Sequence, residues 1–230
     1  MRTVLAVLAA GSSRRAGEDK ILADLGGRPV VCWSLAAAAV SGAFDAVVVV
    51  APPERRDAVA GAVADSFPDV RVVAGGATRT ASAWAALDAA GDAELVGLHD
   101  AARPFVTPSL LARCVEVAAR EGSAVAGLPL ADTVRRADEA GRTLEEVARE
   151  GLWQVQTPQV FRRELLVRAR AAAGDRAFSD DAAALIAAGL EVRMVHGERR
   201  NLKITTMEDL GYARELVAKG LVGVPALRIS

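Results

Sequence analysis

Short runs of β-branched and other apolar residues recur along this chain, and alanine-rich stretches with helical periodicity separate them. Because the runs are apolar at nearly every position, they predict strands that are buried on both faces of a largely parallel sheet. The predicted strands are residues 3–8, 46–51, 70–73, 95–98, 124–128 and 192–195, and the predicted helices are residues 30–40, 55–65, 79–89, 108–120, 163–173, 179–188 and 208–218. This alternation predicts an α/β fold with a doubly wound, mostly parallel sheet, which binds ligands at the carboxyl ends of its strands.

Residues 130–152 break the alternation, because they are polar and lack a stripe of core-facing positions. A long surface loop is one interpretation. A β-hairpin arm fits better, since Thr133-Val134 and Thr143-Leu144 flank a turn near Gly141. An isolated hairpin is only marginally stable in water. We therefore expect one domain, residues 1–230, whose arm packs against a second copy of the chain to form a homodimer.

Composition narrows the class of protein. Apolar residues make up 52% of the chain and the formal net charge is −1, which indicates a globular protein without the basic excess typical of nucleic-acid binding. Residues 1–10 imitate a short signal peptide, but a buried strand before a glycine turn is the better interpretation, and no apolar run approaches the ~18 residues of a membrane helix. Cys32 and Cys114 lie far apart in apolar segments, which favours two buried thiols. We expect a cytoplasmic location and no membrane partner.

A glycine turn with nearby cations follows the first predicted strand, in residues 8–20 (LAAGSSRRAGEDK). Small residues around Gly11 let backbone N–H groups approach a phosphate closely, and Arg15 and Lys20 add full positive charges. The glycine fingerprints of dinucleotide-binding and P-loop proteins are absent. The segment is therefore either a phosphate-binding turn of another class or an ordinary connection between a strand and a helix.

A second glycine-rich turn, residues 75–82 (GGATRTAS), follows the third predicted strand. Its paired glycines permit close approach to the backbone. Arg79 and Ser82 could face a bound base or ribose, or the segment could be a plain loop that caps the following helix.

A carboxylate stands at the end of the fourth predicted strand, in residues 99–105 (HDAARPF). Asp100 is well placed to hold Mg²⁺, which often combines one carboxylate with substrate phosphates. Arg103 suits a second phosphate through its fork of N–H donors. His99 is a candidate base, but a packing or hydrogen-bonding role is the simpler interpretation. Ser179, farther along, fits the N-cap of a predicted helix.

The order and spacing of these motifs resemble those of a known family. Further motifs are DTVRR at 132–136, GLWQVQTPQVF at 151–161, FSDDAAAL at 178–185 and NLKIT at 201–205. Nearly the whole chain is similar to the 2-C-methyl-D-erythritol 4-phosphate cytidylyltransferase family of the non-mevalonate isoprenoid pathway. The resemblance implies a Rossmann-like nucleotidyltransferase that transfers CMP from CTP to methylerythritol phosphate and releases pyrophosphate.

The resemblance also implies roles for individual residues. Those implied to bind the nucleotide are Leu8, Ala9, Ala10, Gly11, Gly76, Ser82 and Ala101. Those implied to be catalytic are Arg15, Lys20, Arg149 and Lys203, with Mg²⁺ on Asp100. Those implied to contact the polyol phosphate are Asp100, Arg103, Thr133, Arg149, Thr157, Ser179 and Lys203. In this family the arm reaches into the partner subunit, so Thr133 and Arg149 are expected to serve the neighbour's site.

The chain departs from the family pattern at a few positions, and two other functions stay open. Asp19, Ala16, Ala77, Ala148 and Ser179 stand where the family usually has proline, methionine, an acid, aspartate and threonine. One alternative is a ribitol 5-phosphate cytidylyltransferase, against which the alanine pair of HDAARP argues by resemblance. The other is a non-catalytic nucleotide-binding subunit, which the full set of charged residues disfavours.

Overall fold

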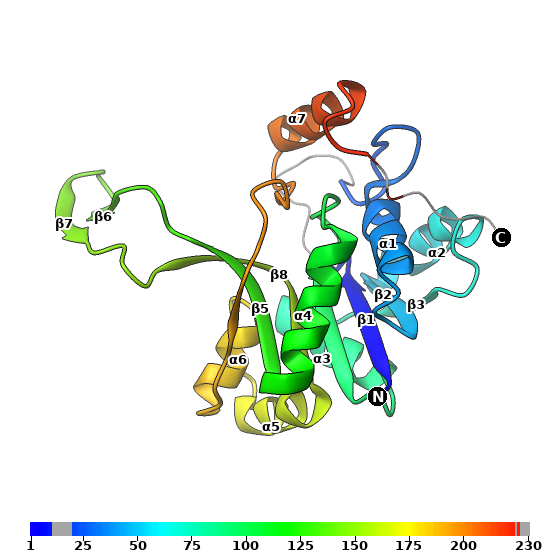
Figure 1. Ribbon diagram of the computed structural model, residues 1–230, viewed down its shortest axis with the longest axis horizontal. Coiled ribbons are helices and arrows are strands. Elements are labelled where there is room, and N and C mark those ends of the chain that lie inside the picture. Colours follow the sequence, from blue (N-terminus) through cyan, green and yellow to red (C-terminus); the bar gives the residue numbers. More distant parts are fainter. Residues whose placement is uncertain (11–19, 224, 226–230) are drawn as a thin grey trace.

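The structure is a computed structural model that describes residues 1–10, 20–223 and 225. Its strands form one large sheet and a separate two-stranded hairpin (Figure 1). The strands are β1 (Thr3–Leu8), β2 (Ala46–Ala51), β3 (Arg71–Ala74), β4 (Leu95–Asp100), β5 (Ser123–Pro129), β6 (Val134–Ala137), β7 (Thr143–Val147), β8 (Trp153–Arg162) and β9 (Met194–His196). The helices are α1 (Val30–Ser41), α2 (Arg56–Ala64), α3 (Arg79–Ala89), α4 (Pro108–Glu121), α5 (Arg163–Ala173), α6 (Asp181–Ala187) and α7 (Met207–Ala218), with a 3₁₀ turn at Pro53–Arg55.

The large sheet has the strand order β3-β2-β1-β4-β8-β5-β9. Its strands are parallel except β8, which is antiparallel to both β4 and β5. The predicted doubly wound, mostly parallel fold is therefore confirmed, but strand β8 was not among the predicted strands. Pro158 argues against a central strand because it has no N–H to donate. It is tolerated here because the β5–β8 register is irregular between Val125 and Gly127, where the ladder skips this part of β8.

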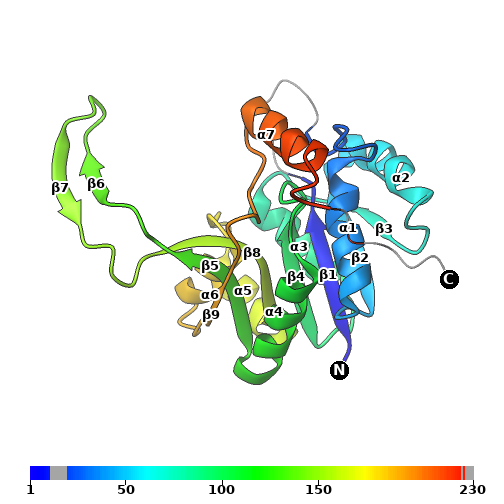
Figure 2. The same ribbon diagram turned by 45° about the horizontal axis from the view of Figure 1, so that its top comes forward.

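Helices cover both faces of the sheet, and alternate residues of β1 show why (Figure 2). Leu5 and Val7 pack into a core with α1, α2 and α4, whereas Val4, Ala6 and Leu8 pack into a second core with α3, α5 and α6. All six strand residues are buried. Two-sided burial explains the continuous apolar run that predicted this strand.

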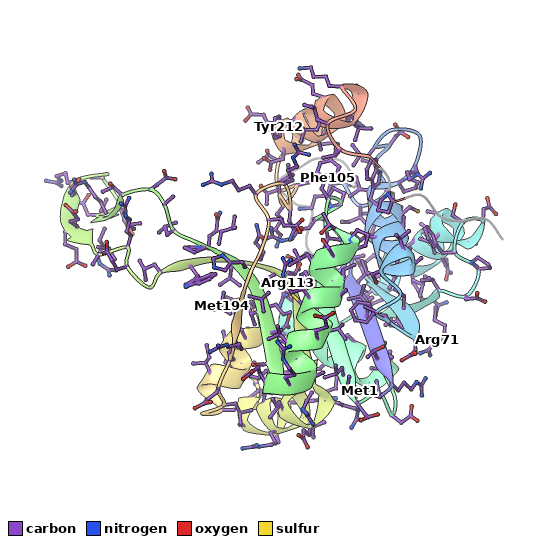
Figure 3. All side chains as sticks on the ribbon, viewed as in Figure 1. Met1, Arg71, Phe105, Arg113, Met194 and Tyr212 are labelled. Atoms are coloured by element: carbon purple, nitrogen blue, oxygen red, sulfur yellow. The ribbon has the colours of Figure 1, made fainter. Side chains whose placement is uncertain are left out.

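A third, smaller core attaches α7 and the segment before it to the rest of the molecule. Trp33 packs edge-on against Phe105, with ring centroids 5.4 Å apart, and Ile204 and Leu210 complete the contact. Figure 3 shows Phe105 beneath α7, beside the start of α4. This packing brings the residues around Ile204 to the end of the sheet where β4 terminates.

The predicted hairpin is confirmed as β6 and β7, which pair with each other and with no other strand among the described residues. Gly141 has φ +78° in the turn, a backbone conformation that glycine adopts at little cost. The arm extends away from the body of the molecule in both ribbon views (Figures 1 and 2).

Within the described part of the chain, no helix has the length and apolar character to cross a bilayer. Cys32 and Cys114 are free and buried, as predicted.

Candidate functional site

Two adjoining cavities lie where β1 and β4 end. Leu8 and Asp100 are the last residues of these strands and are register partners, so the chain leaves both strands at the same edge of the sheet. The first cavity, of about 100 Å³, is lined by Leu8, Ala10, Lys20, Ile21, Arg79, Ser82, Asp100, Ala102 and Lys203. The second, of about 280 Å³, is lined by Arg79, Asp100, Arg103, Val155, Gln156, Thr157, Gln159, Ser179, Asp180 and Lys203. Of the described residues, three line both cavities, and all three are charged: Arg79, Asp100 and Lys203.

A larger hollow of about 670 Å³ lies elsewhere, between the start of α4 and the segment after α7. Val40, Phe105 and Leu221 are among its mostly apolar lining. The motif residues Asp100 and Lys203 line the two smaller cavities and not this one. Because charged side chains converge on the smaller pair, we take those two cavities as the candidate site.

Asp100 lies at the centre of a group of cations. Lys203 Nζ donates to its Oδ2 at 2.7 Å, Arg79 Nη2 lies 3.5 Å from its Oδ1, and Arg103 Nε lies 4.0 Å from its Oδ2. Burial alone would raise the pKa of this carboxyl, but the charges of Lys203, Arg79 and Arg103 outweigh it and lower the pKa to about 2. Asp100 is therefore a carboxylate at any physiological pH.

Lys203 owes its position to a segment that is tied to the rest of the site. Arg103 Nη1 donates to the carbonyl of Asn201 at 2.7 Å, and the buried Asn201 side chain donates to the carbonyl of Thr157 at 2.8 Å. Gln156 bonds the Glu198 backbone twice, through its Nε2 at 3.0 Å and its Oε1 at 3.2 Å. These bonds fix the backbone on which Lys203 stands, 103 residues after Asp100.

Strand β8, which the hydrophobic pattern did not predict, connects the separate motifs of the site. Besides Gln156, it carries Gln159, which is fully buried, donates to Asp180 at 2.9 Å and accepts from the amide of Ala182 at 3.0 Å. A signal for this strand existed: apolar Val160 and Phe161 precede a helix, as in the other strands. Because the residues before them are mostly polar, this segment was interpreted as a functional motif and not as a strand.

His99 takes part in a buried hydrogen-bond chain, as the simpler interpretation held. The Thr157 hydroxyl accepts from the amide of Asp100 at 3.0 Å and lies 3.1 Å from His99 Nδ1, while His99 Nε2 lies 3.2 Å from the carbonyl of Arg103. The carbonyl of Arg103 can only accept, so Nε2 carries the proton of the neutral ring and donates to it, and the unprotonated Nδ1 accepts from the Thr157 hydroxyl. Burial lowers the pKa of His99 to about 4.

This buried histidine predicts a loss of stability in mild acid. The unfolded chain binds a proton at His99 below pH ~6.5 and the folded protein only below about 4, so the free energy of unfolding should fall by about 2 kcal/mol between pH 7 and pH 5. Urea unfolding at the two pH values measures the change. The His99→Asn variant should lose this part of the pH dependence, whereas a variant of the exposed His196, His196→Gln, should keep it. Equal slopes in all three proteins would contradict the assignment.

Several predicted nucleotide-binding residues line the first cavity, and others only support it. Leu8, Ala10 and Ser82 line it, whereas Ala101 is fully buried and its amide donates to the carbonyl of Leu8 at 3.0 Å. Its neighbour Ala102 takes the place at the cavity wall. Ala9 and Gly76 lie outside the lining. The Ala9 amide donates to the carbonyl of Val50 at 2.8 Å, and the Gly76 amide donates to Ser82 Oγ at 3.2 Å. Gly11 and Arg15 lie outside the described residues.

A glycine is required at position 76 because of helix packing. A Cβ there would come within 2.4 Å of Ala81 Cβ on α3. The glycine therefore lets the start of α3 lie against the turn after β3, which orients Ser82 and Arg79. The N-cap of α3 is Thr78, whose side chain accepts from the amide of Ala81 at 3.0 Å, so the capping interpretation of this motif is correct as well.

The predicted polyol-phosphate contacts divide into two groups. Asp100, Arg103, Thr157, Ser179 and Lys203 line the second cavity, although Thr157 is almost completely buried. Thr133 and Arg149 are exposed on the arm and line neither cavity, and Arg149 donates to the carbonyl of Ala131. One prediction is wrong: Asp180 caps α6 by accepting from the amide of Ala183, so Ser179 lies one residue before the N-cap.

The carboxylate oxygens of the site can hold a divalent cation only if a bound substrate supplies further oxygen ligands. Among the described residues, no three His, Cys, Asp or Glu side chains cluster as metal ligands. Among the described residues that line the cavities, Asp100 and Asp180 carry carboxylates. Both oxygens of Asp180 accept hydrogen bonds, from Gln159 and Ala183, whereas Oδ1 of Asp100 is the less engaged of its two oxygens. Mg²⁺ is commonly held by one or two carboxylates together with substrate phosphates and water. The residues present fit Mg²⁺ if the phosphates of a nucleotide supply the other ligands.

Comparison with known proteins places this site in a family. The sequence model described as "IspD: 2-C-methyl-D-erythritol 4-phosphate cytidylyltransferase" matches residues 3–219. The protein of that name from Deinococcus radiodurans is 43% identical over 94% of this chain and 89% of its own length. The crystal structure of the protein of that name from Thermus thermophilus is 38% identical, with a TM-score of 0.79 over 95% of this chain and 100% of the other.

Some relatives are longer than this chain. The "Bifunctional enzyme IspD/IspF" of Anaeromyxobacter dehalogenans is 44% identical over 93% of this chain, which spans only 57% of that relative. The matches agree with one another, and the family model covers all of the described residues that line the two cavities. The chain belongs to the 2-C-methyl-D-erythritol 4-phosphate cytidylyltransferase family.

Proposed function

We propose that this protein acts in the cytoplasm and transfers CMP from CTP to 2-C-methyl-D-erythritol 4-phosphate, with release of pyrophosphate. The observation that carries the proposal is the pair of adjoining cavities with Arg79, Asp100 and Lys203 at their common wall. A transferase has to bring two substrates into contact at one point, and here the charges converge where the two cavities adjoin. Family membership supplies the identity of the two substrates.

In the proposed reaction, an oxygen of the acceptor phosphate attacks the α-phosphorus of CTP. The new P–O bond joins the two substrates, the bond from the α-phosphorus to the bridging oxygen breaks, and its electron pair leaves with pyrophosphate. The second pKa of a phosphate monoester is about 6, so the acceptor is mostly a dianion at pH 7 and needs no general base. The buried, neutral His99 agrees with that, because it lines neither cavity.

The main barrier to this reaction is repulsion between two polyanions. Lys20 lines the first cavity, where CTP is proposed to bind against Leu8 and Ser82. Arg103 lines the second, where the acceptor phosphate is proposed to bind. Fixed cations in a partly buried site stabilise developing charge more strongly than water does, because they need no reorganisation. Holding both phosphates in line supplies a further part of the rate.

Mg²⁺ is proposed to bind Asp100 together with triphosphate oxygens, where it would neutralise charge on the phosphates and polarise them. Asp100 is prepared for this because its pKa is held at about 2. Lys203, whose Nζ lies 2.7 Å from Oδ2, would keep the carboxylate oriented, and Asp100 would hold the ion.

The arm, residues 130–152, is proposed to complete the site of a second subunit in a homodimer. Leu144 is 62% exposed on β7 and Leu152 is 38% exposed beside β8, although both are apolar. A two-stranded hairpin needs a surface to pack on. Thr133 and Arg149 would then contact the acceptor phosphate of the partner.

A pyrophosphate-release assay tests the proposal. The protein is incubated with Mg²⁺, one of the four nucleoside triphosphates, and either methylerythritol phosphate or ribitol 5-phosphate. We expect the combination of CTP and methylerythritol phosphate to react at least about tenfold faster than any other, since a pocket built for one substrate rejects analogues by factors of this order or more. Faster reaction with ribitol 5-phosphate would favour that alternative. Binding of CTP with no release of pyrophosphate would favour a non-catalytic subunit.

A further inference from the structure

Arg79 lies at the junction of the two cavities and has no role yet in the reaction proposed above. It is the first residue of α3 and lines both cavities, as do Asp100 and Lys203. Its side chain is only 25% exposed. A cation in this position can reach both substrates, because the first cavity is proposed to hold CTP and the second the acceptor phosphate.

Two carboxylates hold the guanidinium in place. Arg79 Nη1 and Nη2 donate to the two oxygens of Asp181 at 2.9 and 2.8 Å, a bidentate pair, and Nη2 also lies 3.5 Å from Asp100 Oδ1. Asp181 is the first residue of α6 and only 4% exposed. Asp181 therefore anchors the fork of Arg79, and Nη2 of the same fork also lies beside Asp100 at the wall that the two cavities share.

The charge balance favours a role toward anions. Among the described residues, four cations line the two cavities, Lys20, Arg79, Arg103 and Lys203, against two carboxylates, Asp100 and Asp180, and the buried Asp181 pairs with Arg79 outside the lining. Burial opposes the charge of Arg79, but Asp181 and Asp100 raise its pKa above the ordinary value, so it stays protonated. A guanidinium also offers several N–H donors in a fixed plane, which suits phosphate oxygens.

We propose that Arg79 is a further catalytic residue of this reaction: it contacts phosphate oxygens where the α-phosphate of CTP meets the acceptor phosphate. Asp181 is a positioning residue that acts through Arg79, because it fixes the plane of the guanidinium. The inference rests on the proposed function. An anchored donor of this kind stabilises the transition state without reorganising during the reaction. The competing interpretation is a plain structural link between α3 and α6.

The test removes the pair as a unit. Loss of Arg79 alone would leave the buried Asp181 unpaired and could unfold the protein, so the main variant is Arg79→Met with Asp181→Asn. We expect this double variant to fold, to bind CTP in titration calorimetry within about threefold of wild type, and to lose about 10²–10³-fold in kcat. The Asp181→Asn single variant should lose about tenfold in kcat. Where Arg79 is already methionine, the Asp181→Asn change should lower kcat little further, because Asp181 acts only through Arg79.

A matched control separates catalysis from helix attachment. Arg170 on α5 pairs with Asp88 on α3 at 2.6 Å, so Arg170→Met also removes an ion pair between two helices on this face. This variant should keep kcat within about twofold of wild type. Thermal unfolding midpoints of all variants show whether any loss of kcat comes from unfolding.

Two results would overturn the inference in different ways. If wild-type protein releases pyrophosphate and the folded double variant has a kcat within about threefold of it, Arg79 has no catalytic role. If wild-type protein does not react with CTP and either acceptor, the proposed function fails, and the role of Arg79 in that reaction fails with it.

Discussion

Replacing Lys203 with methionine is expected to lower the turnover number of pyrophosphate release by about 10²–10³-fold. Methionine keeps most of the length of the side chain and removes its charge. Lys203 contacts Asp100 at 2.7 Å and lines both cavities, so its loss affects both proposed substrates. Among the charges that lower the pKa of Asp100, that of Lys203 has the largest effect. The pKa of Asp100 should therefore rise in the variant. Steady-state pyrophosphate release over a range of both substrates measures the effect.

The third lysine of the chain provides the control. Lys219 pairs with Glu215 at 3.2 Å on the surface of the molecule, with both side chains mostly exposed. Lys219→Met should therefore react like wild type. Lys203→Arg should recover only part of the loss, because a planar guanidinium cannot replace a compact ammonium in the same space. Turnover of Lys203→Met within about threefold of wild type would remove Lys203 from the mechanism.

Two inactive subunits are expected to form an active dimer when their defects lie in different parts of the site. One subunit carries Arg149→Ala in the arm and the other carries Lys203→Met in the body. If the arm serves the neighbour, the mixed dimer has one site with both defects and one intact site, so it should show about half of wild-type activity per dimer. Arg149 lies outside both cavities of its own chain, which is the observation behind this prediction.

The experiment requires dimers of defined composition. The two subunits carry different affinity tags, are produced together, and are purified over both tags in turn. Arg142→Ala is the control, because Arg142 also lies on the arm but pairs with Asp138 at 3.2 Å near the turn. That variant should be active alone. A mixed dimer as inactive as its parents would mean that Arg149 acts within its own subunit. An active Arg149→Ala homodimer would mean that Arg149 has no role in the reaction, and a purely monomeric protein would exclude the proposed arrangement.

Local patterns in the sequence predicted most of the fold. The strand at residues 3–8 could be recognised because both of its faces are buried, which makes every position apolar. The arm could be recognised because its polar residues leave no face for the core, and because Gly141 supplies the positive φ that its turn needs. These features depend only on neighbouring residues, so one sequence is enough to read them.

Strand β8 could not be read in the same way. Its residues Gln156, Thr157 and Gln159 are polar but buried, because they bond the segments of the site, and Pro158 argues against a central strand. Only its position between β4 and β5, antiparallel to both, explains how Gln156 reaches the Glu198 backbone and how Gln159 reaches Asp180. Period and composition do not say which strands pair.

By itself, the sequence determined the α/β class, the arm, and the motifs that supply Lys20, Asp100 and Lys203. The tertiary structure alone decided which distant side chains meet, such as Arg79 and Asp181, which are 102 residues apart and bonded through both oxygens of the carboxylate. It also placed Ala102 at the cavity in place of Ala101. The physical reason is that hydrophobic periodicity fixes which way a side chain faces, whereas contacts between distant segments depend on strand order and helix packing, which no local pattern encodes.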